Sequence, residues 1–292
     1  MKVLITGAGG QLGRALMARA RDSGTTLGLT HERLDIADPV AVESVLREFR
    51  PDVLINAAGF TRVDDAEKEP DAAQRANAAG PAVLAAGCRS QGAWLVQVST
   101  DYVFDGAQAH PYVPASPANP LSVYGKTKLQ GEQAVTAELP ARSIVVRTSW
   151  LYAADGRNFL TTMLHLMRSR PRLTVVSDQV GAPTSVAGLA NVLWALAERR
   201  VPGCYHWCDS GVASWYDFAV AIAEEALAVG ILGSSPAIVP IPSAEYPTAA
   251  RRPPYSLLDK RDTERLLETS ALHWRSALRE TLRALRPPGS PS

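Results

Sequence analysis

The stretch VLITGAGGQLGRAL, residues 3–16, decides the fold, because it joins a short apolar strand to a helix through a glycine-rich turn. Gly7, Gly10 and Gly13 have the spacing that permits a tight turn, close approach of a pyrophosphate and close packing of the helix on the strand. The N-terminus of the helix would present free N–H groups and the positive end of its dipole to the phosphates. Taken alone the glycines fit a purely structural turn as well, but after the first strand of an alternating pattern they predict a dinucleotide site.

That alternating pattern runs through the first 150 residues. Short apolar runs occupy residues 2–6, 25–30, 52–56, 93–99 and 143–149, and they are continuous, as is typical of strands buried on both faces. Helical stretches lie between them, at residues 11–23, 38–49, 69–90 and 127–139. Strands and helices that alternate in this way predict an α/β protein with a doubly wound parallel sheet, the Rossmann arrangement.

After Trp150 the pattern loosens, and we expect a smaller C-terminal substrate lobe. Residues 172–178 and 203–207 have the composition of two further strands, with a helix at 185–200 between them. We therefore expect a dinucleotide-binding domain of residues 1–150 joined by about 171–208. Residues 151–170 and 209–292 are expected to form the substrate-binding lobe.

Composition narrows the possible partners. The 292 residues carry a net charge of +1, which gives no electrostatic reason to expect nucleic acid or an anionic membrane as partner. The longest uncharged apolar helix candidate has 12 residues, against the roughly 20 that cross a bilayer. Three cysteines cannot all pair, and no secretory signal precedes the first strand, so a cytoplasmic protein is expected.

The stretch YGKTK, residues 124–128, holds two of the five lysines of the chain. On a helix, Tyr124 and Lys128 share one face, whereas Lys126 points roughly opposite. A phenol has a pKa of about 10, and a nearby ammonium group lowers that pKa toward the working pH. By itself the pair also fits a solvated helix face.

A third stretch, STDYVFDG at residues 99–106, supports the catalytic interpretation. Thr100 falls at the carboxyl end of the fourth predicted strand. Ligands of open parallel sheets bind outside such strand ends, so Thr100 is expected to face the nicotinamide region.

The sequence does not distinguish NADH from NADPH as the cofactor. In this kind of site an acidic residue about 20 positions after the glycine turn favours NADH, and an arginine favours NADPH. The chain offers both, Glu32 and Arg33.

Several blocks of sequence resemble a known family. TGAGGQLG, NAAGF, STDYVFDG and YGKTK together resemble the extended short-chain dehydrogenases/reductases. The blocks VDDAEKEPDAAQRAN, RTSWLYAADGRNF, VSDQVGAPTS, SWYDFA and RRPPYSLLD extend the resemblance to the dTDP-4-dehydrorhamnose reductase family, over nearly the whole chain.

The resemblance implies a role for each candidate residue. Tyr124 would protonate the C4 oxygen of a keto sugar, Lys128 would hold the nicotinamide ribose and lower the pKa of the tyrosine, and Thr100 would hydrogen-bond the same oxygen. The cofactor would lie along Gly7, Gly10, Gln11, Leu12 and Gly13 at the pyrophosphate, Asp35 and Ile36 near the adenine, and Ala57 and Ala58. Asp101 and Trp150 would contact the sugar nucleotide, although a loop cap and ordinary core are the alternatives for these two.

The chain departs from the family in two places. Some relatives are magnesium-bridged dimers that use glutamates, one of them just after the third glycine of the turn. Here Arg14 follows that glycine, and the second region offers Val186 and Ala187, so we expect a monomer or weak homodimer with no bridging metal. Phe60 stands where relatives often have tyrosine, which removes a hydroxyl near the cofactor.

Two further segments of the sequence give weaker signals. Cys204, His206 and Cys208 share one face of a predicted strand, but three ligands on one strand cannot surround a tetrahedral ion, so no metal site is predicted. Arg251 or Arg252 could contact a nucleotide diphosphate, or the segment could be a rigid loop.

The resemblance implies NADPH- or NADH-dependent reduction of dTDP-4-dehydro-L-rhamnose to dTDP-L-rhamnose, with a small nucleotide sugar as partner. Another sugar-nucleotide reductase or an epimerase is the first alternative. A dehydratase is disfavoured, because Tyr102 stands where a second carboxylate would be needed. A non-catalytic protein, resembling the regulatory subunit of methionine adenosyltransferase, is the second alternative.

Overall fold

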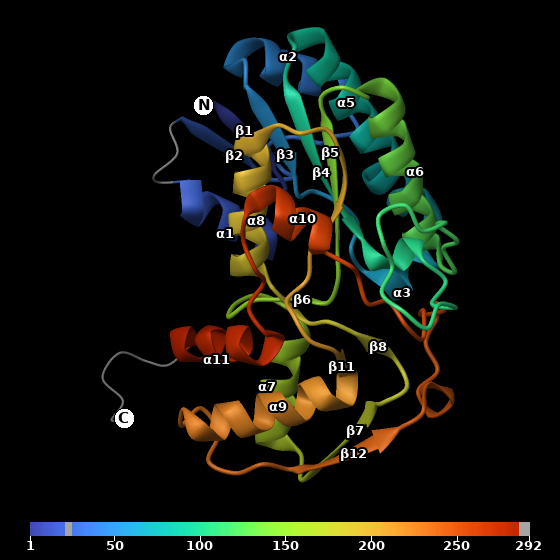
Figure 1. The fold of residues 1–292 in the computed structure, drawn as a ribbon, viewed down its shortest axis with the longest axis vertical. Helices are drawn as coiled ribbons and strands as arrows, with labels where there is room; N and C mark the ends of the chain where they lie inside the picture. The colour runs from blue at the N-terminus through green and yellow to red at the C-terminus, as the bar shows by residue number, and fades with distance from the viewer. Residues whose placement is uncertain (21–24, 286–292) are drawn as a thin grey trace.

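The computed structural model describes residues 1–20 and 25–285, in a large sheet-containing part and a smaller lobe beneath it (Figure 1). The large part has a six-stranded parallel sheet in the order β10-β5-β4-β3-β1-β2. The strands are β1 (Val3–Thr6), β2 (Thr26–Leu29), β3 (Val53–Asn56), β4 (Trp94–Thr100), β5 (Ser143–Thr148) and β10 (Gly203–His206). This arrangement confirms the predicted doubly wound α/β fold.

Helices cover both faces of the sheet (Figure 1). One face packs against α1 (Gln11–Arg19) and α8 (Val186–Arg199), and the other against α2 (Pro39–Phe49), α5 (Gly80–Gln91) and α6 (Val123–Glu138). The central strands β1 and β3 are buried at every position, because both of their faces are covered. Burial on both faces explains why each of these strands is a continuous run of apolar residues in the sequence.

The order of the strands creates a switch point between β1 and β3. From β1 the chain passes to β2 on one side and then to β3 on the other side. Thr6 and Asn56, the last residues of β1 and β3, lie opposite each other in the register. Ligands of such sheets bind at the crevice where the direction of winding reverses, so the fold itself points to this edge.

The helix predicted at residues 69–90 is interrupted in the structure. It consists of α4 (Pro70–Gln74), the π-helical turn η2 (Arg75–Ala79) and α5. Pro81 has no N–H to donate to the carbonyl of Asn77, four residues earlier, which favours a widened turn here. A Cβ on Gly131 of α6 would lie 2.1 Å from that same carbonyl oxygen, so α6 packs closely against the widened turn.

The smaller lobe has its own core between helices and short strands. Helices α7 (Phe159–Ser169), α9 (Trp215–Ala228) and α11 (Trp274–Leu285) surround the core. Its strands pair two by two: β7 (Arg172–Val176) with β12 (Ala237–Ile241), β6 (Leu151–Tyr152) with β9 (Thr184–Ser185), and β8 (Val180–Gly181) with β11 (Ala213–Ser214). The remaining short helices are α3 (Val63–Ala66), η3 (Asp101–Val103), η4 (Ser243–Glu245) and α10 (Arg261–Leu267).

One part of the expected domain division is wrong. Residues 171–208 were expected to join the large sheet, but β7 pairs with β12 in the lobe, and α8 and β10 are the parts that join. The reason is visible in the burial of β7, which alternates between exposed and buried residues at its start. A strand with one exposed face belongs to a small sheet covered on one side. The end of the expected lobe, residues 286–292, lies outside the described residues, as do residues 21–24.

Within the described ranges, no helix combines the length and the apolar character needed to span a membrane.

Candidate active site

The glycine turn lies at the switch point and packs directly on the segment after β3. Gly7 has a φ of 72°, and a Cβ there would lie 2.5 Å from the backbone nitrogen of Ala58. A Cβ on Gly13 would lie 2.1 Å from the carbonyl oxygen of Gly7. Only glycine fits either position, so the backbone of the turn is drawn tightly over Ala57 and Ala58.

Helix α1 begins directly after this turn, with Gly10 as its N-cap and no side chain capping its first N–H groups. Gln11 and Leu12 form the first turn, whose N–H groups lack partners within the helix. The structure thus places the predicted pyrophosphate residues around one helix N-terminus, which suits the phosphates of a dinucleotide.

A buried polar network fixes the strand ends beneath the turn. The Thr6 hydroxyl donates to Asn56 Oδ1 at 2.6 Å, and Asn56 Nδ2 donates to Gln97 Oε1 at 2.8 Å. The backbone N–H of Ala58 also donates to Asn56 Oδ1, at 3.1 Å. Sequence reasoning missed this network. Its signal was a polar residue at or near the end of each apolar strand.

The predicted adenine residues follow β2. Asp35 accepts a hydrogen bond of 2.7 Å from Arg75 and one of 2.9 Å from the N–H of Ala37, and the bond from Arg75 is the main reason that the pKa of Asp35 is lowered. Ile36 is buried, and a Cβ on Gly80 would lie 2.6 Å from its side chain. The carboxylate of Asp35 is therefore engaged by the start of η2.

Helix α6 carries Tyr124 and Lys128, and its N-terminus is held at three points. The Ser122 side chain caps the N–H of Gly125 at 3.1 Å, and Glu67 accepts from the N–H of Val123 at 2.8 Å. A Cβ on Gly125 would lie 2.2 Å from the carbonyl oxygen of Tyr102, so the helix begins in direct contact with the segment after β4. This contact brings Tyr124 next to Thr100.

Lys128 is buried, with 7% of its surface exposed, whereas Lys126 is exposed, so the predicted difference between the two lysines is confirmed. Lys128 Nζ donates to the carbonyl oxygen of Val98 at 2.6 Å. Burial disfavours the charged form and lowers the pKa of Lys128 to about 8.

Tyr124 is half-buried, and the surrounding protein raises the pKa of its hydroxyl to about 12, with a hydrogen bond to Thr100 acting in the opposite direction. Desolvation by burial is the largest cause of the rise, the charge of Asp101 adds to it, and Lys128 is not among the groups that shift this pKa. The expected lowering of the pKa by Lys128 is therefore not found in this structure. Tyr124 is consequently protonated at pH 7, which suits a proton donor.

Asp101 is almost fully buried beside Thr100. The Thr100 hydroxyl donates to Asp101 Oδ1 at 3.1 Å, and Oδ2 has no hydrogen-bond partner within the described residues. Burial raises the pKa of Asp101 to about 6. Thr100, rather than Asp101, caps the following turn by accepting from the N–H of Tyr102 at 3.2 Å.

Trp150 is held in a fixed orientation at the start of the lobe. Its ring stacks on Trp215 with 3.6 Å between centroids and 6° between planes, and its backbone has a φ of 47°. The Trp215 indole N–H donates to Gln179 at 3.1 Å, and a Cβ on Gly181 would lie 2.9 Å from the Trp150 ring. The half-buried indole of Trp150 is therefore clamped and does not belong to either main core.

The two arginines at 251 and 252 differ. Arg252 forms an ion pair of 2.7 Å with Asp64 of α3, whose carboxylate also accepts from the N–H of Ala250 at 3.0 Å. Arg251 is exposed and has no ion pair among the described residues. In this structure the segment is a loop braced by Asp64.

Asn77 is a further residue that sequence reasoning missed. Its Oδ1 accepts from the N–H of Phe60 at 2.8 Å, and its Nδ2 donates to the carbonyl of Phe60 at 3.0 Å and to Thr127 Oγ1 at 3.3 Å. It thereby fastens the segment after β3 to α6, between Tyr124 and Lys128. The signal was its position inside the polar block that follows the NAAGF stretch.

The strand β10, at the edge of the large sheet, carries Cys204 and His206 and ends before Cys208. Burial lowers the pKa of His206 to about 3, and its Nδ1 lies 2.9 Å from the carbonyl oxygen of Tyr112. The three cysteines of the chain are free, and the part of the chain that the structure describes holds no group of three residues able to bind a metal.

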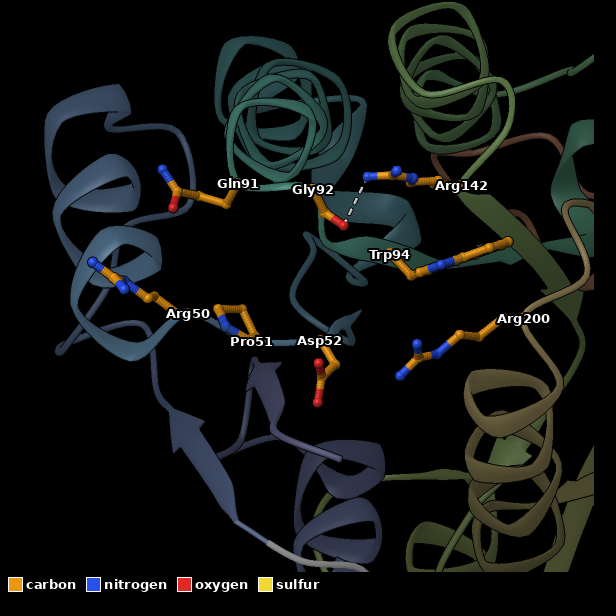
Figure 2. Close-up of a pocket in the computed structure, with 8 residues that line it drawn as sticks. All are labelled: Arg50, Pro51, Asp52, Gln91, Gly92, Trp94, Arg142 and Arg200. Carbon is orange, nitrogen blue, oxygen red and sulfur yellow. Dashed lines mark hydrogen bonds between the residues drawn. The ribbon is translucent and has the colours of Figure 1, made fainter.

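A hollow of about 400 Å³ lies at the amino ends of the strands, opposite the carboxyl ends where the candidate active site lies (Figure 2). Arg142 donates to the carbonyl oxygen of Gly92 there, and Arg142 and Arg200 lie on the same side of Asp52 in the view, opposite Arg50 (Figure 2). Its lining residues are Arg50, Pro51, Asp52, Gln91, Gly92, Trp94, Arg142 and Arg200. None of the predicted site residues is among them, so this hollow is separate from the candidate active site.

A glycine turn at the switch point of a parallel sheet, with Thr100, Tyr124 and Lys128 at the neighbouring strand end, defines an extended short-chain dehydrogenase/reductase. Comparisons with known proteins agree. Residues 1–286 match the family model of the RmlD substrate binding domain, and the chain belongs to this family.

Relatives of the chain are similar over almost their whole length. It is 41% identical to a dTDP-4-dehydrorhamnose reductase of Aggregatibacter actinomycetemcomitans, with 95% of this chain and 97% of that protein covered. A crystal structure of a dTDP-4-dehydrorhamnose reductase from Clostridium acetobutylicum is 40% identical, with a TM-score of 0.92 and coverage of 98% and 99%. That of Bacillus anthracis, in complex with NADP, is 35% identical, with a TM-score of 0.90 and coverage of 97% and 99%.

Proposed function

We propose that this protein reduces the C4 keto group of dTDP-4-dehydro-L-rhamnose to give dTDP-L-rhamnose, with NADPH or NADH as the reductant. The observation that carries the proposal is the grouping of Thr100, Tyr124 and Lys128 beside the glycine turn. It occurs in a chain 41% identical to a named reductase of this kind, and another such reductase was solved in complex with NADP.

The residues at the switch point fit a dinucleotide. A Cβ at Gly7 or Gly13 would collide with backbone, and the first turn of α1 presents N–H groups without side-chain caps. Gln11 and Leu12 would hold the pyrophosphate, and Ala57 and Ala58 would lie along the cofactor. When bound, the nicotinamide supplies the hydride.

Tyr124 would donate the proton that the C4 oxygen needs as hydride arrives at C4. A pKa of about 12 keeps its hydroxyl protonated over the working pH range. The Thr100 hydroxyl donates its single proton to Asp101 Oδ1 in this structure. With substrate bound, it would turn that proton to the same C4 oxygen and stabilise the negative charge that develops there. One site would then supply the proton from Tyr124, the hydride from the nicotinamide and the hydrogen bond from Thr100 to the C4 oxygen.

Lys128 would hold the nicotinamide ribose through its ammonium group. Its Nζ reaches the carbonyl of Val98 in β4, two residues before Thr100, so the charge lies at the strand end where the ribose is expected. A positive charge there also stabilises the phenolate that Tyr124 becomes after it gives up its proton. Asp101 and the clamped Trp150 would contact the sugar nucleotide.

We further propose that the protein works in the cytoplasm as a monomer or weak homodimer, without a bridging metal. Arg14, at the position of the glutamate of metal-bridged relatives, binds Asp155 of the same chain at 3.0 Å. EDTA treatment is expected to leave the initial rate unchanged. Loss of activity with EDTA and its return with magnesium would contradict this.

One experiment tests the main proposal. The purified protein is mixed with dTDP-4-dehydro-L-rhamnose and either NADPH or NADH, the loss of absorbance at 340 nm is followed, and the sugar product is identified. One reduced cofactor is expected to be consumed per dTDP-L-rhamnose formed. Product formed without cofactor consumption would favour an epimerase, and no turnover with capture of a partner enzyme would favour a regulatory protein.

A further inference from the structure

A buried ion pair lies one helical turn beyond Lys128. Glu132 of α6 is 5% exposed and Arg147 of β5 is 7% exposed. Arg147 Nε donates to both carboxylate oxygens, at 3.0 and 3.1 Å, and Nη2 donates to Oε2 at 2.7 Å. The carboxylate of Glu132 is thus held by three hydrogen bonds from a neighbouring strand.

The pair is closed off by the segment after η3. Arg147 Nη1 donates to the carbonyl of Pro114 at 3.2 Å, and the guanidinium lies 5.1 Å from the centre of the Phe104 ring. Phe104 in turn stacks on Tyr112 at 4.1 Å. Because an unpaired buried charge is costly, neither Glu132 nor Arg147 can leave this arrangement alone.

Glu132 and Lys128 are four residues apart, so their side chains lie on the same face of α6. Burial lowers the pKa of Lys128, and the charge of Glu132 opposes that change. Lys128 must keep its proton to bind a ribose hydroxyl and stabilise a phenolate. The fixed negative charge of Glu132, one helical turn away, favours the protonated form of Lys128.

The elements packed against α6 carry other titratable groups: Asp64 and Asp65 on α3, Asp71 on α4, Arg75 on η2, Cys88 and Arg89 on α5, Asp101 and Tyr102 on η3, and Arg147 on β5. Asp65 and Arg89 form ion pairs with Arg62 and Glu138, and Asp71 is exposed. Asp64 and Arg75 form ion pairs with Arg252 and Asp35. Burial raises the pKa values of Cys88 and Tyr102, which are therefore neutral at pH 7. Asp101 ionises with a pKa of about 6, well below the range in which Lys128 loses its proton.

We propose that Glu132, clamped by Arg147, is a positioning residue for the catalytic lysine: it fixes a negative charge one turn behind Lys128 and so keeps the ammonium group charged and directed at the strand end. Glu132 touches neither cofactor nor substrate in this role and acts through Lys128. The inference rests on the proposed function only for the role of Lys128 in holding the cofactor ribose.

The test is the pH dependence of the Glu132→Gln variant, which keeps the shape of the side chain and removes its charge. NADPH affinity is measured by fluorescence from pH 6 to 10, and kcat/KM with the keto sugar over the same range. The alkaline midpoint of both profiles is expected to fall by about one pH unit, with values near those of the unmodified protein at pH 6.

Two further variants keep the test decisive. Glu225 is also 5% exposed and is held by Arg275 and Arg279 at 2.8 and 2.7 Å between α9 and α11, so Glu225→Gln removes an equally buried carboxylate far from Lys128. It is expected to lower the Tm and to leave the alkaline midpoint unchanged. The double variant Glu132→Gln/Arg147→Met leaves no unpaired guanidinium and is expected to shift the midpoint in the same direction as Glu132→Gln.

Alkaline midpoints equal to that of the unmodified protein in both Glu132 variants would overturn the proposal and reduce the ion pair to a structural role. Absence of keto-sugar turnover by the unmodified protein would instead overturn the proposed function. In that case the midpoint of NADPH binding still decides whether Glu132 acts on Lys128.

Discussion

At the scale of single residues, Tyr124 provides a test of the proposed mechanism, and Lys126 on the same helix provides its control. Tyr124→Phe removes the hydroxyl that Thr100 contacts and is expected to lower kcat by about 10²–10⁴-fold, because loss of a positioned proton donor has effects of this size. NADPH affinity is expected to stay within about threefold, since the ring remains. Lys126→Ala, on the exposed side of the helix, is the control and should have no effect.

Steady-state rates and NADPH titrations of the two variants provide the measurement. A near-normal kcat for Tyr124→Phe would remove Tyr124 from the proposed mechanism.

Asp101 offers a prediction about stability and pH. Its pKa is raised to about 6 by burial, from the model-compound value of 3.8. A carboxyl group that binds its proton more tightly in the folded state stabilises the protein while protonated, and this contribution is lost as the pH rises from about 4 through 6. The side chain of the Asp101→Asn variant cannot ionise. The free energy of unfolding of this variant, relative to that of the unmodified protein, should therefore rise by on the order of 2 kcal/mol between pH 4 and pH 7.5.

Urea unfolding of both proteins at the two pH values measures that difference. An unchanged difference between pH 4 and pH 7.5 would show that Asp101 is already ionised in the folded protein at low pH.

At the scale of elements, the position of α6 depends on Gly125. A Cβ there would lie 2.2 Å from the carbonyl oxygen of Tyr102, so Gly125→Ala must move the helix or the segment after β4. Overpacking of this kind costs about 1–3 kcal/mol, and we expect urea unfolding to show a loss in that range. Because the same shift separates Tyr124 from Thr100, kcat should fall by at least about tenfold.

Lys126→Ala adds no atom at the contact and is the matched control one residue along the helix. If Gly125→Ala lost stability and kept its full kcat, the spacing between α6 and η3 would not matter for catalysis.

Elements also show how far sequence patterns reach. The runs at 52–56 and 143–149 predicted β3 and β5 correctly, because strands buried on both faces give a continuous apolar signal. The same kind of reading assigned residues 172–178 to the large sheet, whereas β7 pairs with β12 about 65 residues later. Pairing between distant segments leaves no local signal, and the alternation of polar Arg172 and Thr174 with apolar Leu173 and Val175 was the only hint in the sequence.

The candidate site divides in the same way. Tyr124, Lys128 and the glycines could be named because each needs a particular residue type at a particular spacing. Asn77, Glu132 and Arg147 could not, because their partners lie on other elements and their role follows from packing. The pKa of Tyr124 was misjudged for a related reason, since desolvation depends on the whole surroundings of the hydroxyl.

At the scale of the whole molecule, the loop after β6 joins the lobe to the glycine turn. Arg14 of α1 binds Asp155 at 3.0 Å and the carbonyl of Gly9 at 2.6 Å, and Asn158 lies 3.4 Å from Gln11. Asp155→Ala removes one of these contacts over the predicted pyrophosphate site. We expect the dissociation rate constant of NADPH to rise by about 1.5- to fivefold, an effect in the range of one exposed ion pair.

Stopped-flow displacement of NADPH at low salt measures this rate constant. The difference from the unmodified protein should shrink at high salt, because exposed charges are then screened. Glu43→Ala breaks an exposed ion pair with Arg47 on α2, away from the lobe, and should leave the rate constant unchanged. Equal effects of the two substitutions would mean that the loop does not retain the cofactor.

The place of β10 at the edge of the sheet has a consequence for biosynthesis. Gly203–His206 pair with β5, which ends at Thr148, so more than 50 residues separate the two strands along the chain. While the ribosome makes those residues, β5 is an open sheet edge with unpaired backbone N–H and C=O groups, the kind of edge through which nascent chains associate. The lobe strands made in that interval, β6, β7, β8 and β9, pair with other strands of the lobe and not with β5. Completion of the nucleotide-binding sheet therefore waits on a strand that is synthesised after part of the lobe.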